Sequence, residues 1–195
     1  MKTANFIVVG VGGQGTILAS DVLAQTGLEA GLDAKKSEVH GMAQRGGSVI
    51  SHVRWGEKVY SPLIGKGEAD FLLAFEKLEA LRYAEWLKPG GVAVVNDQAV
   101  PPVAVSSGGA EYPSDERFHA AFHGMGARAY LVPGIAAARE LGDARVNNVV
   151  LLGALSALLD ITPELWKTVI AGRVPPKYVE LNLKAFDHGR TLMAK

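Results

Sequence analysis

A glycine-rich turn near the N-terminus is the first feature of the chain that could do chemistry. It follows the apolar, β-branched run of residues 6–9 and precedes a helical pattern that begins at Thr16. Gly10, Gly12 and Gly15 have the spacing GxGxxG, the fingerprint of strand–turn–helix sites for dinucleotides. Glycine suits such a turn because it tolerates positive φ, and because N–H groups at a helix start can then approach an anion closely. The candidate binding residues of this turn are Gly10, Gly12, Gly13, Gln14 and Gly15.

A second polar, glycine-rich stretch follows at residues 37–48, and two such loops at one end of a sheet would make a site. Its candidate binding residues are Ser37, Glu38, His40, Gly41, Gln44, Arg45, Gly46 and Gly47. Polar residues between glycines favour a role at a shared active site or toward a partner. The alternative is that they cap helix ends and satisfy loop carbonyls. A histidine such as His40 could move protons near neutral pH, but the sequence fixes no partner for it, so the catalytic residues stay unknown.

Two functions remain open from these residues alone. A usual NAD site has an acid about twenty residues after the last glycine, where this chain has Lys35, Lys36 and Glu38. Glu38 could serve, but the two lysines fit a phosphate-bearing ligand better. A stand-alone nicotinamide or flavin nucleotide-binding oxidoreductase is therefore one alternative, and a non-catalytic interaction protein is another.

Composition narrows the class of protein further. The 195 residues fit one domain, with 20 basic and 20 acidic residues and no basic tract for nucleic acid. No run of 18 apolar residues and no signal peptide is found, so a cytoplasmic location and no membrane partner are expected. The chain has no cysteine, which excludes disulfides and thiolate-held iron–sulfur clusters. His119 and His123 are four apart on a predicted helix, but a solvated face is a better reading than a metal site, and none is predicted.

The strand pattern predicts a three-layer, Rossmann-like α/β fold with a mostly parallel sheet. One antiparallel hairpin is expected, in which residues 59–61 pair back on the alternating strand 48–55. An extended piece is expected at residues 101–105. The other predicted strands are 6–9, 32–39, 70–75, 92–96 and 129–133.

The helical pattern alternates with these strands and then dominates the end of the chain. Helices are predicted from Thr16 to Glu29 and over 76–87, 115–123, 135–141 and 147–159. Thr162 and Pro163 mark the start of another helix, and a terminal helix follows Pro176. The single domain 1–195 therefore has a mainly helical C-terminal part over 135–195.

Two motifs together resemble the gamma domain of the 2-oxoacid:ferredoxin oxidoreductases. They are Gly12-Gly13-Gln14-Gly15 at the end of the first strand and the run from Ser37 to Gly47. The resemblance covers nearly the whole chain, including Asn147-Asn148 and the run from Pro176 to Asn182. Within the family, the pattern is most similar to the small subunit of the indolepyruvate enzymes.

The resemblance implies a small subunit of a complex that is not catalytic alone. Such a complex converts an aryl 2-oxoacid, coenzyme A and oxidised ferredoxin to acyl-CoA, carbon dioxide and reduced ferredoxin. Thiamine diphosphate and the iron–sulfur clusters would belong to a large partner subunit. The glycine loops would shape the site entrance or contact the phosphates of coenzyme A. For Asn147, Asn148, Lys177, Tyr178 and Asn182, a structural role is preferred to a chemical one.

Overall fold

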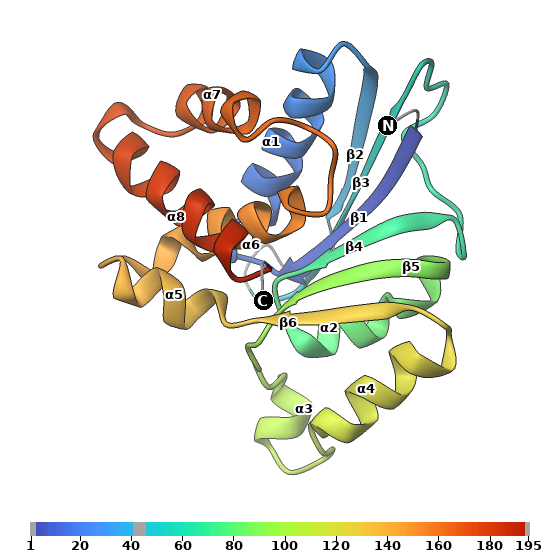
Figure 1. Cartoon of the computed structure of the whole chain (residues 1–195). Helices are drawn as coiled ribbons and strands as arrows, with labels where there is room; N and C mark the ends of the chain where they lie inside the picture. Colours follow the sequence, from blue (N-terminus) through green and yellow to red (C-terminus); the bar gives the residue numbers. More distant parts are fainter. Residues whose placement is uncertain (1–2, 41–45, 194–195) are drawn as a thin grey trace.

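The chain folds around one six-stranded sheet, in a computed structural model that describes residues 3–40 and 46–193 (Figure 1). The strands lie in the order β2-β3-β1-β4-β5-β6. They are β1 (Thr3–Val11), β2 (Asp33–His40), β3 (Ser48–Gly56), β4 (Ala69–Ala74), β5 (Leu87–Asn96) and β6 (Arg128–Val132). β3 runs antiparallel to both neighbours, and the pairs β1–β4, β4–β5 and β5–β6 are parallel. The predicted α/β fold with a mostly parallel sheet is confirmed.

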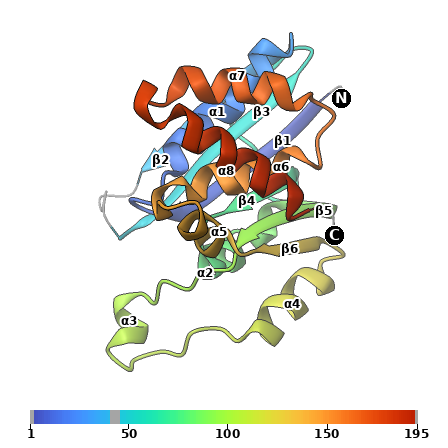
Figure 2. The same ribbon diagram turned by 60° about the vertical axis from the view of Figure 1, so that its left-hand side comes forward.

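Helices cover both faces of the sheet and give three layers (Figures 1 and 2). One face carries α1 (Thr16–Glu29), α6 (Asn147–Ser156), α7 (Pro163–Arg173) and α8 (Val179–Thr191), which contact one another, and α5 (Gly134–Glu140) packs on α6. The other face carries α2 (Lys77–Arg82) and α4 (Asp115–Gly124), with the short α3 (Val103–Ser106) beyond them. None of the helices within the described ranges is long and apolar enough to cross a membrane.

The core has two parts because the central strands are buried on both faces. Along β1, Phe6 and Val8 pack under α1 and α6, whereas Ile7 and Val9 pack toward α2 and α4. This alternation follows from the two-residue period of a strand. A continuous apolar run is therefore what a strand between two helical layers requires.

The α6–α8 contact depends on two glycines that let the helix backbones approach closely. A Cβ on Gly189 would lie 1.9 Å from the carbonyl oxygen of Val150, and a Cβ on Gly153 would lie 2.1 Å from that of Phe186. All ten residues of α6 are buried. The apolar helix α6 is therefore part of the core.

Three local predictions were wrong. Residues 59–61 form no strand, and the antiparallel hairpin is made by β2 and β3 instead. The segment after the turn is held by side chains, because Val59 N donates to Asp33 Oδ2 and Arg54 donates to the carbonyl of Leu63. The extended piece at 101–105 is partly α3, which starts directly after the two prolines. The predicted helix 76–87 is helical only as α2, to Arg82, and a 3₁₀ turn at Ala84–Trp86 then leads into β5.

Candidate functional site

The glycine turn closes on itself through Gln14. Its Oε1 accepts the backbone N–H of Val11 at 2.8 Å, so the side chain folds back over Gly10. A Cβ on Gly10 would lie 2.9 Å from that oxygen and 2.8 Å from Thr16 Cγ2. Gly13 and Gly15 have φ of 102° and 83°, which a residue with a side chain rarely adopts. Of the three fingerprint glycines, Gly10 is therefore required by a close contact and Gly15 by its positive φ, whereas no such constraint is given for Gly12.

The second loop meets the first through backbone hydrogen bonds. Gly12 N donates to the carbonyl of Gly47 at 2.8 Å, and Gly46 N donates back to the carbonyl of Gly12 at 3.4 Å. The structure therefore brings the glycines of both loops together at the carboxyl end of β1. Gly41, Gln44 and Arg45, and the side chain of His40, lie outside what the structure describes.

Ser37 and Glu38 lie along the edge strand β2, opposite His52 and Ser51 of β3. The neighbouring lysines are engaged in ion pairs, Lys36 with Asp21 and Glu38, and Lys35 with Asp33. These four residues do not line the cavity that the glycine turn faces. The lysines therefore do not supply the phosphate contacts that the sequence suggested.

A cavity of about 400 Å³ adjoins the glycine turn on the α1 and α6 side of the sheet. It is lined by Gly13, Gln14, Gly15, Gln98, Ile135, Ala144, Arg145, Asn147 and Asn148. The first turns of α1 and α6 both border it. Neither helix has a side-chain cap or an acidic residue in its first turn. The positive dipole ends of two helices therefore face one cavity, which suits an anion. At the start of α6 two N–H groups are already engaged, because that of Asn147 donates to the carbonyl of Ala144 and that of Val149 donates to Asn148 Oδ1 at 2.9 Å.

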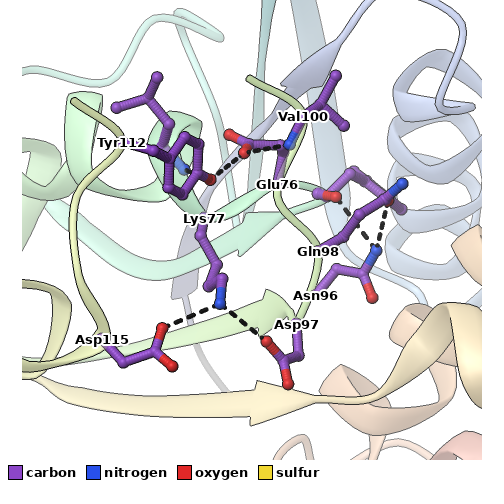
Figure 3. Close-up of polar contacts among 10 residues, drawn as sticks. Glu76, Lys77, Asn96, Asp97, Gln98, Val100, Tyr112 and Asp115 are labelled. Carbon is purple, nitrogen blue, oxygen red and sulfur yellow. Dashed lines mark hydrogen bonds and ion pairs between the residues drawn. The ribbon is translucent and has the colours of Figure 1, made fainter. Parts of the chain in front are cut away.

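Amide side chains make up most of the polar lining. Gln14 Nε2 donates to the carbonyl of Phe75 at 3.2 Å and to Gln98 Oε1 at 3.3 Å. Asn96 Nδ2 also donates to Gln98 Oε1, at 3.0 Å (Figure 3). Asn148 covers Gly15 so closely that a Cβ there would lie 2.5 Å from its Nδ2. The lining thus offers hydrogen bonds and a helix field but no acid–base pair, so it can bind and orient a ligand.

One buried amide at this cavity lacks a partner within the described residues. Asn147 is 5% exposed, and its Oδ1 accepts no hydrogen bond, nor does Oδ1 of the fully buried Asn96. Both atoms lie 2.8 Å from the position that a Cβ on Gly134 would take. A buried polar atom without a partner costs about 1–3 kcal/mol.

A second cavity, of about 390 Å³, lies on the α2 side of the same sheet edge and is lined in part by Gly46, Ser48, Glu76, Glu79 and Arg82. Ser48 Oγ donates to Glu79 Oε2, and Arg82 Nε lies 3.3 Å from Glu79 Oε1. Burial raises the pKa of the Glu79 carboxyl, and the nearby Glu76 acts in the same direction, while Ser48 and Arg82 oppose it. This acidic cavity is unsuited to an anion.

Glu76 ties the segment after β5 to the start of α2. Its Oε2 accepts the N–H of Glu79 at 2.8 Å, and its Oε1 accepts the N–H of Val100 at 3.0 Å and the hydroxyl of Tyr112 (Figure 3). Lys77 adds ion pairs to Asp97 at 3.0 Å and Asp115 at 2.9 Å. Each of these groups has a structural partner, so they hold the fold and leave ligand binding to the other cavity.

Sequence reasoning missed several residues of the amide-lined cavity. Gln98, Ile135, Ala144 and Arg145 carried no motif, and for Asn147 and Asn148 the sequence favoured a structural role. In the structure Val146 is the cap position, and Asn147 is the first residue of α6. His119 and His123 lie exposed on α4, and within residues 3–40 and 46–193 no group of three or more metal-ligating side chains is found.

Comparison with known proteins identifies the family to which this chain belongs. The chain matches the pyruvate ferredoxin/flavodoxin oxidoreductase family over residues 5–192 and belongs to it. It is 42% identical to the indolepyruvate oxidoreductase subunit IorB of Pyrococcus horikoshii, over 97% of this chain and 95% of that one.

Two solved structures share the fold over its full length. The gamma subunit of a keto/oxoacid ferredoxin oxidoreductase from Geobacter sulfurreducens is 27% identical, with a TM-score of 0.73 and 98% of each chain covered. The 2-oxoglutarate:ferredoxin oxidoreductase of Magnetococcus marinus is also 27% identical, with a TM-score of 0.77. All of this chain is covered but only 31% of that one, which holds 2-oxoglutarate, coenzyme A and succinyl-CoA. The predicted family is confirmed.

Proposed function

We propose that this chain is the small subunit of an indolepyruvate-type 2-oxoacid:ferredoxin oxidoreductase complex. The complex would convert an aryl 2-oxoacid, coenzyme A and oxidised ferredoxin to acyl-CoA, carbon dioxide and reduced ferredoxin, in the cytoplasm. The observation that carries this proposal is the 42% identity to an indolepyruvate oxidoreductase subunit over nearly the whole of both chains. The 2-oxoglutarate enzyme, at 27%, is more distant.

The redox and carbanion chemistry would then belong to a large partner subunit. This chain has no cysteine, so it offers no thiolate ligand for an iron–sulfur cluster. Its sequence also lacks the Gly-Asp-Gly motif, with a paired asparagine about thirty residues later, that marks thiamine-binding chains. Thiamine diphosphate on the partner supplies the carbanion chemistry. The small subunit would complete the site through its glycine turn.

The cavity at the starts of α1 and α6 is the place on this chain that best fits the phosphates of coenzyme A. Gly12 N–H and Gln14 N–H are already donated within the two loops. No hydrogen bond is recorded for the N–H groups of Gly13 and Gly15 anywhere in the described part of the chain. These donors, the start of α6 and Arg145 surround the space in which a phosphate would lie. The related 2-oxoglutarate enzyme binds coenzyme A.

Anaerobic co-expression with the large subunit tests the subunit proposal. The purified complex should reduce ferredoxin in the presence of indolepyruvate and coenzyme A, with a higher kcat/KM than for pyruvate or 2-oxoglutarate. The large subunit alone should lose this activity and regain it when this chain is added. Full activity of the large subunit without this chain would contradict the proposal.

Two matched charge variants test the phosphate contact. Asn148→Asp keeps the shape of the side chain and adds a negative charge beside the cavity, so the KM for coenzyme A should rise about tenfold or more. Thr162→Asp adds the same charge at the exposed N-cap of α7, which lines neither cavity at the glycine turn. Its KM should stay at the wild-type value. An unchanged KM in Asn148→Asp would contradict the contact.

A further inference from the structure

The outer edge of β2 is open to a further strand. β2 lies at one end of the sheet and, within residues 3–40 and 46–193, pairs with β3 alone. A free edge presents a row of backbone N–H and C=O groups that can pair with another strand. Lys35, Lys36 and Glu38 lie on this strand, and charges at an edge disfavour any added strand that does not match them. The charges therefore restrict which strand can be added.

The order of charges along β2 matches that of a second, antiparallel β2 in one register. Residues directly opposite each other in an antiparallel pair point to the same face, so a two-fold pairing must place one residue opposite its own copy. With Lys35, Lys36 or Glu38 on the axis, like charges would lie opposite each other, which destabilises the pair. With Ser37 on the axis, Lys36 of each copy lies opposite Glu38 of the other. In this register the strand is therefore complementary to itself.

The flank of α1 beside this edge carries an exposed apolar stripe. Ile17 and Leu28 are 45% and 47% exposed. Their spacing along the chain places them on one helix face together with Asp21 and Ala24. Asp21 forms an ion pair with Lys36, so this face lies on the β2 side of the helix. The open edge and the apolar stripe therefore adjoin each other.

The position of α1 relates this stripe to the same two-fold pairing. α1 packs on both β2 and β3, so its axis lies above the space between these strands (Figure 2). Across a β2–β2 pairing the two copies of α1 would lie two strand spacings apart, about 10 Å, which is a distance at which helices pack. Ile17 and Leu28 would then be buried between them. A lone strand from another protein would leave the stripe exposed.

We propose that two copies of this chain associate through their β2 edges, about a two-fold axis at Ser37. The two sheets then form one continuous sheet, and the two α1 helices pack across the axis. A contact of this kind uses the same surface of both copies, so it closes at a dimer. The interface makes no use of a ligand cavity, so it stands or falls independently of the proposed function.

Charge reversal and mixing of the full chain test the pairing. In Lys36→Glu, glutamates face each other across the interface, and in Glu38→Lys, lysines do. The dissociation constant of each variant alone, measured by sedimentation equilibrium, should be about tenfold or more above that of wild type. An equimolar mixture should regain the wild-type value, because every cross-strand pair is then of opposite charge. The ion pair between Lys36 and Glu38 within one chain is lost in both variants, mixed or not, so it cannot cause the recovery.

A second pair of variants tests the helix contact and leaves β2 unchanged. Leu28→Lys places an ammonium group between the two α1 helices and should raise the dissociation constant about tenfold or more. The fold should be retained because Leu28 is exposed in one chain. Val103→Lys is the control, because Val103 is 83% exposed on α3, beyond the opposite face of the sheet (Figure 1). It should dimerise as wild type does.

The register has its own test, since the chain has no cysteine. Ser37→Cys places two thiols opposite each other, with Cα atoms about 4.5–5.5 Å apart, so mild oxidation should link them into a covalent dimer. In Lys35→Cys the two thiols would be about 14 Å apart along the strands and should not link. A wild-type chain that stays monomeric, a mixture that does not recover, or equal linking of the two cysteines would overturn the proposal. Protection of the β2 amides only when the large subunit is added would also overturn it and assign the edge to that subunit.

Discussion

The two helical faces of the sheet treat the starts of their helices in opposite ways. On the α2 and α4 face, Glu76 accepts the N–H of Glu79 and Ser114 accepts that of Arg117, and both helices have acidic residues in the first turn. On the other face, α1 and α6 start without a side-chain cap and without an acid. α1, α2 and α4 each lie between two strands along the chain, so their starts gather near the carboxyl ends of the strands. α6 follows α5 with no strand after it, and its start lies beside that of α1 at the same cavity.

The capped starts of α2 and α4 stabilise the fold, whereas the uncapped starts of α1 and α6 can interact with a ligand. A cap or an acid at a helix start is worth about 0.5–2 kcal/mol, so its omission at two neighbouring helices costs stability. The same omission leaves two positive dipole ends directed at the amide-lined cavity, with the N–H groups of Gly13 and Gly15 beside it. The acidic cavity beside Glu76 and Glu79 has its polar groups paired and holds the fold.

The largest expected effect comes from disrupting the packing of α8 against α6, the helix whose start borders the amide-lined cavity. In Gly189→Ala the new Cβ would meet the carbonyl of Val150 at 1.9 Å, so α6 and α8 must separate. The free energy of unfolding should fall by about 3 kcal/mol or more in denaturant titration. Gly172→Ala, in α7 with open space around its Cβ, should instead gain about 0.5–1 kcal/mol. Similar values for the two variants would show that the α6–α8 contact is loose.

The capped face should respond in stability and not in binding. Glu76→Ala removes the cap of α2 and the acceptor for Val100 N and Tyr112, so it should cost about 2 kcal/mol of unfolding free energy. Glu85→Ala, which breaks only an exposed ion pair with Lys66, should cost less than about 1 kcal/mol. The KM for coenzyme A should stay unchanged in both complexes. A raised KM in Glu76→Ala alone would move the ligand site toward the acidic cavity.

Because Glu79 has a raised pKa, the free energy of unfolding should depend on pH in a definite direction. Burial raises its pKa above the ordinary value of 4.5, so the folded state holds the proton more tightly than the unfolded chain. Ionisation of Glu79 therefore removes stability as the pH rises above that ordinary value and through the raised pKa of the folded state. Glu79→Gln lacks this loss, and its unfolding free energy should rise relative to wild type over that interval. A difference that stays constant with pH, or that shrinks, would contradict the buried, proton-binding state.

The smallest effect tests the electrostatics of the uncapped starts directly. Thr162→Asp places a carboxylate at an exposed helix start and should gain about 0.5 kcal/mol of stability at low salt. Asn148→Asp places one where the side chain is only 6% exposed, so desolvation should offset the dipole and leave no gain. The gain should shrink as salt is added, because screening weakens the dipole interaction. Thermal unfolding at two salt concentrations measures both. A loss of stability in Asn148→Asp would show that its amide is needed for the fold.

The sequence predicted the parallel strands well because the central strands must be apolar on both faces. The runs at Phe6 and at Phe71 are such segments, and both lie in the core. It did not predict which strands make the hairpin. The chain does turn away after β3, but the predicted arm at residues 59–61 is held near Asp33 and Arg54 by hydrogen bonds and pairs with no strand. A local signal cannot choose between partners that are distant along the chain.

The difference between local and distant signals also explains why only the glycine turn of the candidate site was predicted from the sequence. Gly10 to Gly15 are recognisable because glycine spacing encodes local backbone geometry. Asn148 and Arg145 reach that turn only through the fold, when α6 packs beside α1. Their residue types alone fit a cap or a surface, so the contact with Gly15 could not be predicted from pattern.

Hydrogen exchange of the assembled complex, with and without coenzyme A, tests the central claim most directly. Coenzyme A should slow exchange of the backbone amides at residues 13–18 and 147–150, the two uncapped helix starts. Residues 77–80 and 115–118, the capped starts, should exchange at the same rate with and without it. Protection at the capped starts, or at neither pair while the large subunit is protected, would contradict the assignment of the ligand cavity to α1 and α6.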